Sequence, residues 1–387
     1  METIGVIFGG RSAEHDVSII TALSSVIKPL ELSRKYKVIA IYVAKDGSWY
    51  SDDKLKDIKL FTSGGLKDHL LNAKPITVQF DGGLTLVKSQ GLRKKLVKVD
   101  VVFPAMHGTY GEDGSLMGLL DMAGVPYVGC GLSASAVAMD KVLAKQLAVA
   151  NDIPVTNFLT FTKATVVQEM NQVIKSVTVS LKYPIFVKPA HLGSSIGISR
   201  VTNDGELRNG LEVAAHYDDR IIVEEGVGNL IEVTLPIIGN NLPKPALLER
   251  PMTQAEDFFD FETKYMQGGK KGGKGTKGAG GSQGYSQIPA QLPKEVYDQA
   301  ESVGLQAYKA LGCSGIARVD MLVDSKSKKV FFNEVNPMPG GLYAHNWAKT
   351  GLSSIDLVER LVVLAKERHT ERQSLVTSFS TSYLQQF

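Results

Sequence analysis

Two short polar runs near the C-terminal end of the chain have the residue types that bind a divalent cation. Arg318 and Asp320 are two residues apart, and so are Glu334 and Asn336. Residues two apart on a β-strand project from the same face of the sheet. If both runs are strands that pair through a turn at 324–329, one face carries an arginine, two carboxylates and an amide oxygen. Such hard oxygen ligands suit Mg²⁺, which takes one or two carboxylates and completes its shell with phosphate oxygens.

A segment rich in glycine and serine has the composition of a phosphate-binding loop. Lys188 ends an apolar run, and the loop follows at 193–197. Backbone N–H groups and hydroxyls in such a loop can hold phosphate oxygens, and the lysine adds positive charge. A glycine–serine turn after an edge strand is the simpler alternative. For the polar face above, the alternative is a solvated hairpin, although Asp and Asn are poor strand formers that need another reason to be there.

A third segment matches a nucleotide-binding pattern but stands in the wrong place. The run GCGLSA at 129–134 fits the dinucleotide pattern GxGxxA, and Asp152 follows at a suitable distance. That pattern belongs after the first strand of its domain, whereas this run follows the fourth strand expected here. We therefore favour a tight strand-to-helix turn over an NAD-binding oxidoreductase. The sequence contains no GxxxxGK[ST] run and so no P-loop.

The elements that must position these residues alternate in type at the start of the chain. A helical pattern at 16–28 ends before Pro29, and short apolar runs predict buried strands at 4–8, 37–43, 99–103 and 125–128. Alternating strands and helices predict an α/β domain with a parallel, doubly wound sheet over 1–135. Two α+β units are expected after it, at 136–220 and 221–370, followed by a polar tail at 371–387.

The two later units contain the candidate residues in regular elements. The predicted helices are 141–150, 294–310 and 354–366, and the predicted strands are 184–188, 221–225, 231–238, 316–323 and 330–335. A segment at 268–284 is mostly Gly, Lys, Ser and Thr. This composition cannot bury apolar surface and predicts a long loop, either a lid over a site or a tolerated insertion.

The overall composition limits the class of protein. The 387 residues are 43% hydrophobic and 21% charged, with a formal net charge of +3. A charge so close to balance does not favour nucleic acid or an anionic membrane as a partner. The two cysteines, Cys130 and Cys313, form no CxxC pair and are expected to be buried thiols. With no signal-peptide pattern and no apolar run long enough to span a membrane, a cytoplasmic enzyme is expected.

The chain resembles the D-alanine–D-alanine ligases in long motifs that follow one another in the order of that family. These motifs are GGRSAEHDVS at 9–18, HGTYGEDG at 107–114, YVG at 127–129, the loop at 188–197, FDFETKY at 259–265, RVD at 318–320 and NEVN at 333–336. Together they extend over nearly the whole chain, from about 4 to 368. The resemblance implies the ATP-grasp fold, in which a doubly wound N-terminal domain precedes two α+β domains that clamp ATP.

The resemblance also implies an ATP site and a metal site. The residues it assigns to ATP are Lys141, Lys188, Ser194, Ser195, Glu224, Glu225, Val227, Glu232 and Lys264. The residues it assigns to Mg²⁺ are Asp320, Glu334 and Asn336, which would hold two ions, with Mn²⁺ as a possible replacement. Phosphoryl transfer needs positioning and charge neutralisation more than covalent help from the protein, and these residue types supply both.

The same resemblance implies the residues that contact the amino acids. Glu14 would hold the ammonium group of the first amino acid. Arg318 and the Gly340 N–H would stabilise the oxyanion of the tetrahedral intermediate that forms when the amine of the second amino acid attacks. Ser194 and Tyr265 would link Glu14 to a closing lid at about 256–290. The lid would keep water from the acyl phosphate that forms when the carboxylate of the first amino acid attacks the γ-phosphate of ATP. The remaining residues expected near the substrates are Ser18, His107, Lys264, Tyr343, His345 and Asn346.

One segment departs from the family pattern. After Asn336 the family usually has Ser and Thr residues that grip the carboxylate of the second amino acid, the acceptor, whereas this chain reads PMPGGLYAHNW. Tyr343, His345 or Asn346 would have to donate hydrogen bonds in their place. The expected function is a D-alanine–D-alanine ligase for peptidoglycan precursors, with ATP and D-alanine as substrates. The alternatives are the same mechanism with another amino acid, a hydroxy acid or a peptide amine as acceptor, and a non-catalytic nucleotide-binding module. A homodimer is possible.

Overall fold

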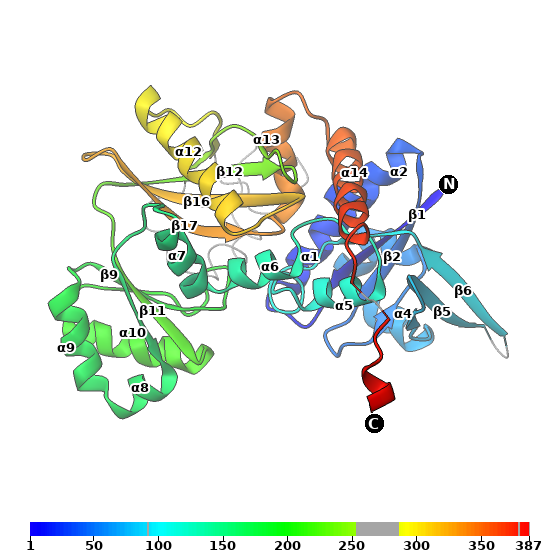
Figure 1. The fold of residues 1–387 in the computed structure, drawn as a ribbon, viewed down its shortest axis with the longest axis horizontal. Helices are drawn as coiled ribbons and strands as arrows, with labels where there is room; N and C mark the ends of the chain where they lie inside the picture. Colours follow the sequence, from blue (N-terminus) through cyan, green and yellow to red (C-terminus); the bar gives the residue numbers. More distant parts are fainter. Residues whose placement is uncertain (91–92, 253–285, 378–379, 387) are drawn as a thin grey trace.

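A computed structural model describes residues 1–90, 93–252, 286–377 and 380–386 of the chain. In these residues the strands form three four-stranded sheets and two smaller ones. Figure 1 shows the three larger sheets in separate parts of the molecule, each with helices packed against it. We call them the first, second and third sheets, in chain order.

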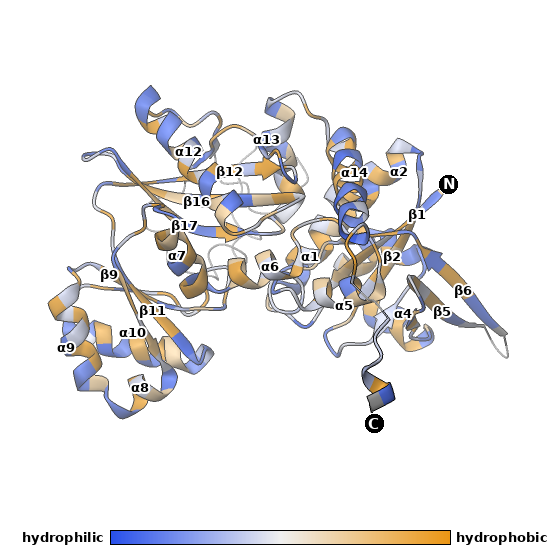
Figure 2. Ribbon diagram, in the orientation of Figure 1, coloured by the Kyte–Doolittle hydropathy of each residue, from blue (hydrophilic) through white to orange (hydrophobic). Residues whose placement is uncertain are grey.

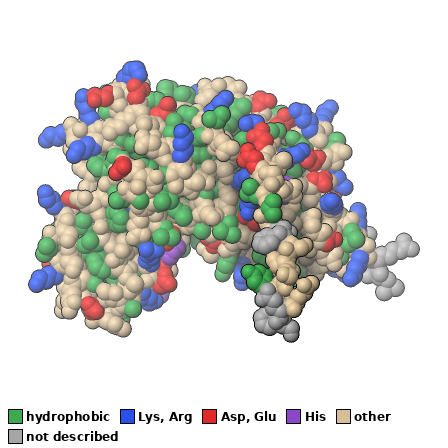
Figure 3. Space-filling model, viewed as in Figure 1, with side chains coloured by type: hydrophobic (Ala, Val, Ile, Leu, Met, Phe, Trp, Pro, Cys, Tyr) green, Lys and Arg blue, Asp and Glu red, His purple; other side chains and the backbone are tan. Residues whose placement is uncertain are grey.

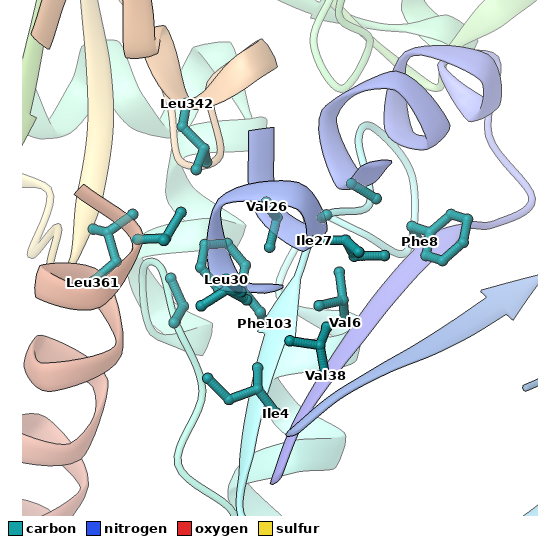
Figure 4. Packing of buried hydrophobic residues seen from close by; sticks show 14 of the residues in the cluster. Ile4, Val6, Phe8, Val26, Ile27, Leu30, Val38, Phe103, Leu342 and Leu361 are labelled. Atoms are coloured by element: carbon teal, nitrogen blue, oxygen red, sulfur yellow. The ribbon is translucent and has the colours of Figure 1, made fainter. Parts of the chain in front are cut away.

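The first sheet is parallel except at one edge, as the alternation of strands and helices predicted. Its strands, in sheet order, are β3 (Trp49–Tyr50), β2 (Tyr36–Val43), β1 (Glu2–Gly9) and β7 (Val101–Pro104). Successive side chains of β1 point to opposite faces, so Ile4, Val6 and Phe8 enter one buried cluster and Ile7 enters another. Figure 4 shows the first three with residues of the neighbouring helix, including Leu30. Both faces are buried, which is the doubly wound arrangement.

The helix predicted at 16–28 is longer than expected and contains a π-helical segment. It consists of α1 (His15–Ile20), the π-helix η1 (Thr21–Ile27) and α2 (Lys28–Ser33). The prediction that it ends before Pro29 was wrong. Pro29 stands in the first turn of α2, where a missing N–H costs little and the fixed φ suits a helix.

Two predictions for the first part of the chain need correction. The run 99–103 is divided at Asp100 between two strands, and 125–128 forms only an isolated bridge between Tyr127 and Val102. Pro126, beside that bridge, has no N–H to donate to a longer ladder. A small antiparallel sheet was also not predicted. The additional elements here are η2 (Asp53–Lys56), α3 (Ile58–Thr62), α4 (Leu66–Asn72), β4 (Thr77–Phe80), β5 (Leu84–Gln90), β6 (Arg93–Val99) and α5 (Ser115–Ala123).

The second sheet is antiparallel and covered by helices on one face. Its strands, in sheet order, are β10 (Ser199–Val201), β9 (Ile185–Pro189), β11 (Arg220–Glu225) and β8 (Phe158–Thr162). The helices of this part are α8 (Lys163–Gln168), α9 (Met170–Ser180) and α10 (Asp204–Tyr217). In Figure 2 these helices carry hydrophilic and hydrophobic residues in alternation, as expected for helices with one face on a core. Both predicted strands, β9 and β11, are confirmed.

The third sheet carries the polar runs with which the sequence argument began. Its strands, in sheet order, are β13 (Lys244–Pro245), β12 (Leu230–Ile238), β16 (Ile316–Asp324) and β17 (Lys329–Asn336). The helices α6 (Leu132–Met139), α7 (Lys141–Ala150) and α12 (Lys294–Ala310) contribute residues to its core. A two-stranded ladder, β14 (Arg250–Pro251) with β15 (Ser286–Gln287), lies beside it. The predictions for α7, α12, β12, β16 and β17 are confirmed, whereas β13, β14 and β15 were not predicted.

The last long helix returns to the beginning of the chain. The turn η5 (Gly340–Tyr343), helix α13 (Ala344–Lys349) and helix α14 (Ser354–Gln373) follow the third sheet. Leu342 and Leu361 belong to the same buried cluster as Ile4 of β1, and Figure 4 shows them around it. Helix α14 continues beyond the predicted end at 366, where Arg368 donates to the Tyr127 and Gly129 carbonyls and Arg372 pairs with Asp121. A short helix, η6 (Tyr383–Gln386), lies near the C-terminus.

The described surface carries mixed charge. Figure 3 shows lysine and arginine side chains interspersed with aspartate and glutamate over the face in view, which is hollowed at its lower edge between the part with the second sheet and the part with the first. Among the described residues, no helix has both the length and the apolar composition needed to cross a membrane.

Candidate active site

The predicted polar face is present on the third sheet. Strands β16 and β17 pair antiparallel, with Arg318 opposite Asn336 and Asp320 opposite Glu334. The Arg318 guanidinium donates two hydrogen bonds to Asp320, from Nε to Oδ1 at 2.6 Å and from Nη2 to Oδ2 at 2.5 Å. The Asn336 amide donates to Asp320 Oδ2 at 3.0 Å. The pairing places all four side chains on one face, and a β-bulge after Asp320 ends the regular register there.

The chemistry of this face fits a hard cation. Burial raises the pKa of Asp320 even though Arg318 lies against it. Burial would also raise the pKa of Glu334, but Lys141, Lys188 and Arg318 hold it below its usual value. Two carboxylates and an amide oxygen, surrounded by cations that can meet phosphate groups, form a donor set that suits Mg²⁺.

A cluster of buried charges lies at the adjoining edge of the second sheet. Glu224 Oε2 accepts a hydrogen bond from Lys188 at 3.1 Å and lies 3.3 Å from Lys145 Nζ, which also donates to Thr156 Oγ1 at 3.2 Å. Burial opposes ionisation of Glu224, but Lys145 and Lys188 lower its pKa to about 2. Its other oxygen, Oε1, is buried and has no hydrogen-bond partner among the described residues. Because Glu224 is held ionised and its Oε1 has no partner among the described residues, this oxygen suits an N–H donor such as the amino group of adenine.

Helix α7 joins the second sheet to the third. Asp140 caps its N-terminus by accepting hydrogen bonds from the N–H groups of Val142 and Leu143. Lys141 and Lys145 are four residues apart and share a face of the helix. Lys141 Nζ donates to the carbonyl of Leu192 at 2.7 Å and lies 3.3 Å from Glu334 Oε2. The sequence argument named Lys141 but missed Lys145, although the spacing was a usable signal.

The glycine–serine loop reaches from the second sheet to the first part of the chain. Ser194 and Ser195 have φ values of 53° and 61°, a left-handed conformation that non-glycine residues rarely adopt. Such conformations persist where surrounding contacts hold them, and they are frequent in ligand-binding loops. The Ser194 hydroxyl donates a short hydrogen bond to Glu14. The predicted link between Ser194 and Glu14 is therefore present.

Glu14 lies close to a second carboxylate, that of Glu112, and to His107. Burial and the nearby Glu112 carboxylate raise the pKa of Glu14. Glu112 accepts a hydrogen bond from the Gly108 N–H at 2.7 Å and lies 3.7 Å from His107 Nδ1. Burial opposes protonation of His107, but Glu112 and Glu14 raise its pKa above the usual value. The sequence argument missed Glu112, although it is part of the quoted run HGTYGEDG.

The turn η5 places the remaining candidates beside Arg318. The Arg318 guanidinium carbon lies 5.1 Å from the centre of the Tyr343 ring, and that ring lies 5.1 Å from the His345 ring. His345 Nε2 is hydrogen-bonded to Glu249 at 2.8 Å. Asn346 is completely buried, and its amide bonds the backbone of residue 247 in both directions. Of the predicted acceptor-side donors, Tyr343 therefore borders the arginine, His345 packs against Tyr343, and Asn346 holds the backbone of residue 247.

Other predicted residues lie at the margin of the site or outside the described residues. Ser18 is completely buried, where it accepts from the Gly9 N–H and donates to the Ala105 carbonyl, so it holds two strand ends together. Glu225 accepts from Asn157 at 2.7 Å. Val227 and Glu232 follow at the end of β11 and in β12, both partly buried. Lys264, Tyr265, the 268–284 loop and most of the predicted lid lie outside the described residues.

Known proteins share this architecture along the whole chain. The family descriptions "D-ala D-ala ligase N-terminus" and "D-ala D-ala ligase C-terminus" match residues 3–130 and 147–363. A D-alanine–D-alanine ligase of Acetivibrio thermocellus is 37% identical over 95% of this chain and 96% of its own length. One of Staphylococcus haemolyticus is 36% identical over 96% of this chain and 97% of its own length.

Solved structures agree with the sequence comparison. The D-alanine–D-alanine ligase of Coxiella burnetii superposes with a TM-score of 0.77 at 30% identity and covers 96% of each chain. The VanG D-Ala:D-Ser ligase of Enterococcus faecalis has the same TM-score and identity and covers 94% of this chain and 99% of its own. The fold is the predicted ATP-grasp fold, and the chain belongs to the D-alanine–D-alanine ligase family.

Proposed function

We propose that this chain is an ATP-dependent ligase that joins two molecules of D-alanine. The observation that carries the proposal is the meeting of three parts of the chain at one site. Ser194 of the second part contacts Glu14 of the first, and Lys141 contacts Glu334 of the third. Each part supplies different groups. The first supplies carboxylates and a histidine, the second supplies lysines and a serine loop, and the third supplies the Arg318–Asp320 face.

The nucleotide would be held by the second and third parts. Lys141, Lys188 and the loop at 194–197 would neutralise phosphate oxygens, and the open oxygen of Glu224 would accept from the adenine amino group. Asp320, Glu334 and Asn336 would hold one or two Mg²⁺ ions, which supply charge neutralisation during phosphoryl transfer. Lys264 is assigned to the phosphates by the family resemblance alone.

The amino acids would be held between the first and third parts. The Glu14 carboxylate would bind the ammonium group of the first D-alanine, near His107. The carboxylate of that amino acid accepts the phosphoryl group of ATP, and the amine of the second D-alanine then attacks the acyl phosphate and releases phosphate. Arg318 and the Gly340 N–H would stabilise the oxyanion of that second step. Tyr265, assigned by resemblance alone, would close the site.

The setting of the reaction follows from its substrates. The dipeptide would serve as a peptidoglycan precursor, and ATP as phosphoryl donor points to the cytoplasm as the compartment. A homodimer stays a prediction that a single chain does not test.

A second candidate is the same chemistry with a different acceptor, such as D-serine. Tyr343 at the end of η5 and His345 in α13 stand where the family usually has smaller hydroxyl residues, and one similar structure is that of a D-Ala:D-Ser ligase. A site built to hydrogen-bond one substrate discriminates strongly against another, so changed donors favour a changed acceptor.

The deciding experiment measures phosphate release from ATP with Mg²⁺ and D-alanine as the sole amino acid, with the product identified by mass. Release with D-alanyl-D-alanine formed supports the first proposal. Release only after D-serine, a D-hydroxy acid or another amino acid is added, with the mixed product formed, supports the second. ATP binding without release under any acceptor would contradict both.

A further inference from the structure

One buried hydroxyl contacts two parts of the site that are far apart in sequence. Thr21 is 1% exposed and begins the π-helix η1. Its Oγ1 lies 2.9 Å from His107 Nε2, and it accepts a hydrogen bond from the Gly341 N–H at 3.0 Å. A threonine hydroxyl has one proton to donate and two lone pairs. Thr21 can therefore hold the imidazole and the Gly341 peptide at the same time.

The backbone around Thr21 is unusual on both sides of these contacts. π-Helical turns are rare and occur frequently at functional sites, and this one begins at Thr21. On the opposite side, Gly341, Leu342 and Tyr343 have φ values of 61°, 55° and 52°. Non-glycine residues rarely adopt this region and persist there only where the surrounding structure holds them.

Three contacts hold this left-handed turn in place. The Thr21 hydroxyl fixes its first peptide, and Leu342 is buried in the cluster that contains Val26 and Leu30 of the facing helix, as Figure 4 shows. The Tyr343 ring lies against the Arg318 guanidinium. Of these three contacts, the one through Thr21 also reaches His107.

We propose that Thr21 is a positioning residue that sets the spacing between His107, beside the first amino acid, and the Gly340–Tyr343 turn, beside the acceptor. This inference rests on the proposed function for the assignment of the two sides. Loss of the hydroxyl would leave His107 Nε2 and the Gly341 N–H without their shared partner, and both groups would reorient. Other connections between the same segments, from the Met338 N–H to Glu112 at 3.3 Å and between His107 and the Met338 backbone, would remain and keep the parts together.

Three variants of the full-length protein test the role. Thr21→Val keeps the shape and removes the hydroxyl, whereas Thr21→Ser keeps the hydroxyl and removes the methyl group. Ser24→Ala is the control, because Ser24 is exposed on the same π-helix. For each variant, kcat, the KM values for both amino acids and the ATP dissociation constant are measured, with the acceptor that the wild type uses.

The expected result is a split between catalysis and nucleotide binding. Thr21→Val should lower kcat/KM for the acceptor about 10- to 100-fold, because two buried groups lose a hydrogen bond, while ATP binding stays within about twofold of the wild type. Thr21→Ser should lie within about threefold of the wild type in every constant, and Ser24→Ala should match it.

The opposite results separate the alternatives. Wild-type kinetics in Thr21→Val would overturn the inference and leave the proposed function intact. Should Thr21→Val not fold, Thr21→Ser decides, because a positioning role predicts retained kinetics and a packing role predicts their loss. No ligation by the wild type with any acceptor would overturn the proposed function and this inference with it.

Discussion

The two halves of the candidate site are built in opposite ways. The nucleotide half lies on strands and on helix α7, and its acidic groups are already paired with cations, as Glu224 is with Lys145 and Lys188. The amino-acid half lies on loops at the ends of β1 and β7 and on the turn η5. There Glu14 lies near a second carboxylate, that of Glu112, and its pKa is raised by burial and by that neighbour.

This difference reflects the charge of the ligand that each half would receive. Lysines that pair with carboxylates can turn toward phosphate oxygens, so the nucleotide half is prepared for an anion. At Glu14, burial and the Glu112 carboxylate outweigh the attraction of His107 and Lys141, so an ammonium group would supply further positive charge there.

The largest effect is expected where the halves meet, at Arg318. Arg318→Met removes the two bonds to Asp320 and the cation beside Tyr343. We expect kcat to fall by about 10³-fold, as for the loss of an oxyanion donor. Steady-state kinetics check this, with Arg360→Met as the control because Arg360 is half exposed on α14. An Arg318→Met enzyme within tenfold of the wild type would remove this residue from the mechanism.

In the nucleotide half, Lys145→Met should destabilise the fold. The substitution leaves the buried Glu224 with Lys188 as its remaining cation, and removing one partner of a buried ion pair costs about 3 kcal/mol. Denaturant unfolding measures the change, and ATP affinity should fall in parallel. Gln146→Ala, exposed on the same helix, is the control. Unchanged stability would mean that Lys188 alone suffices for Glu224.

In the amino-acid half, Glu14→Gln should act on a substrate and not on stability. The neutral amide relieves the repulsion with Glu112 but cannot pair with an ammonium group. We expect the KM for the first amino acid to rise about tenfold or more, with ATP binding unchanged. Asp16→Asn, highly exposed in the same helix, is the control. A KM change confined to ATP would reverse the assignment of the two halves.

The smallest effect concerns His191, near the nucleotide loop. Asp140 and Asp218 bond its ring and raise its pKa to about 10. A raised pKa in the folded state stabilises the protein fully below the unfolded value of about 6.5 and progressively less as the pH rises through about 10. His191→Gln should therefore lower Tm by a few degrees at pH 6 and by little at pH 10.5. Because the ring is half exposed, the loss in free energy of unfolding at pH 6 should be about 1 kcal/mol or less.

A matched histidine separates this effect from a general one. His216→Gln, exposed on α10, should change Tm equally little at both pH values. An equal loss of Tm in His191→Gln at pH 6 and pH 10.5 would show that the ring contributes by packing and not by its charge.

Local pattern determined the residues of each half and most of the elements that carry them. Alternation along a strand was enough to place Arg318 with Asp320 and Glu334 with Asn336, because the side-chain period of a strand is fixed. The helix at 141–150 and five strands of the second and third sheets (β9, β11, β12, β16 and β17) followed from apolar periodicity, whereas β8, β10 and β13 did not. The family resemblance supplied Glu14 and His107, which no local pattern distinguishes from a helix-start acid and a loop histidine.

Only the tertiary structure decided which of these residues meet and what holds them. The contacts of Thr21 with His107 and Gly341 span 86 and 320 positions along the chain. The packing of Leu342 and α14 on the first sheet, and the pairing of Lys145 with Glu224, are equally remote from any local signal. Periodicity reports only which face of an element is buried, whereas the partner of a buried polar group depends on how the elements pack. For that reason the positioning residues of this protein, unlike its motif residues, appear only in the folded chain.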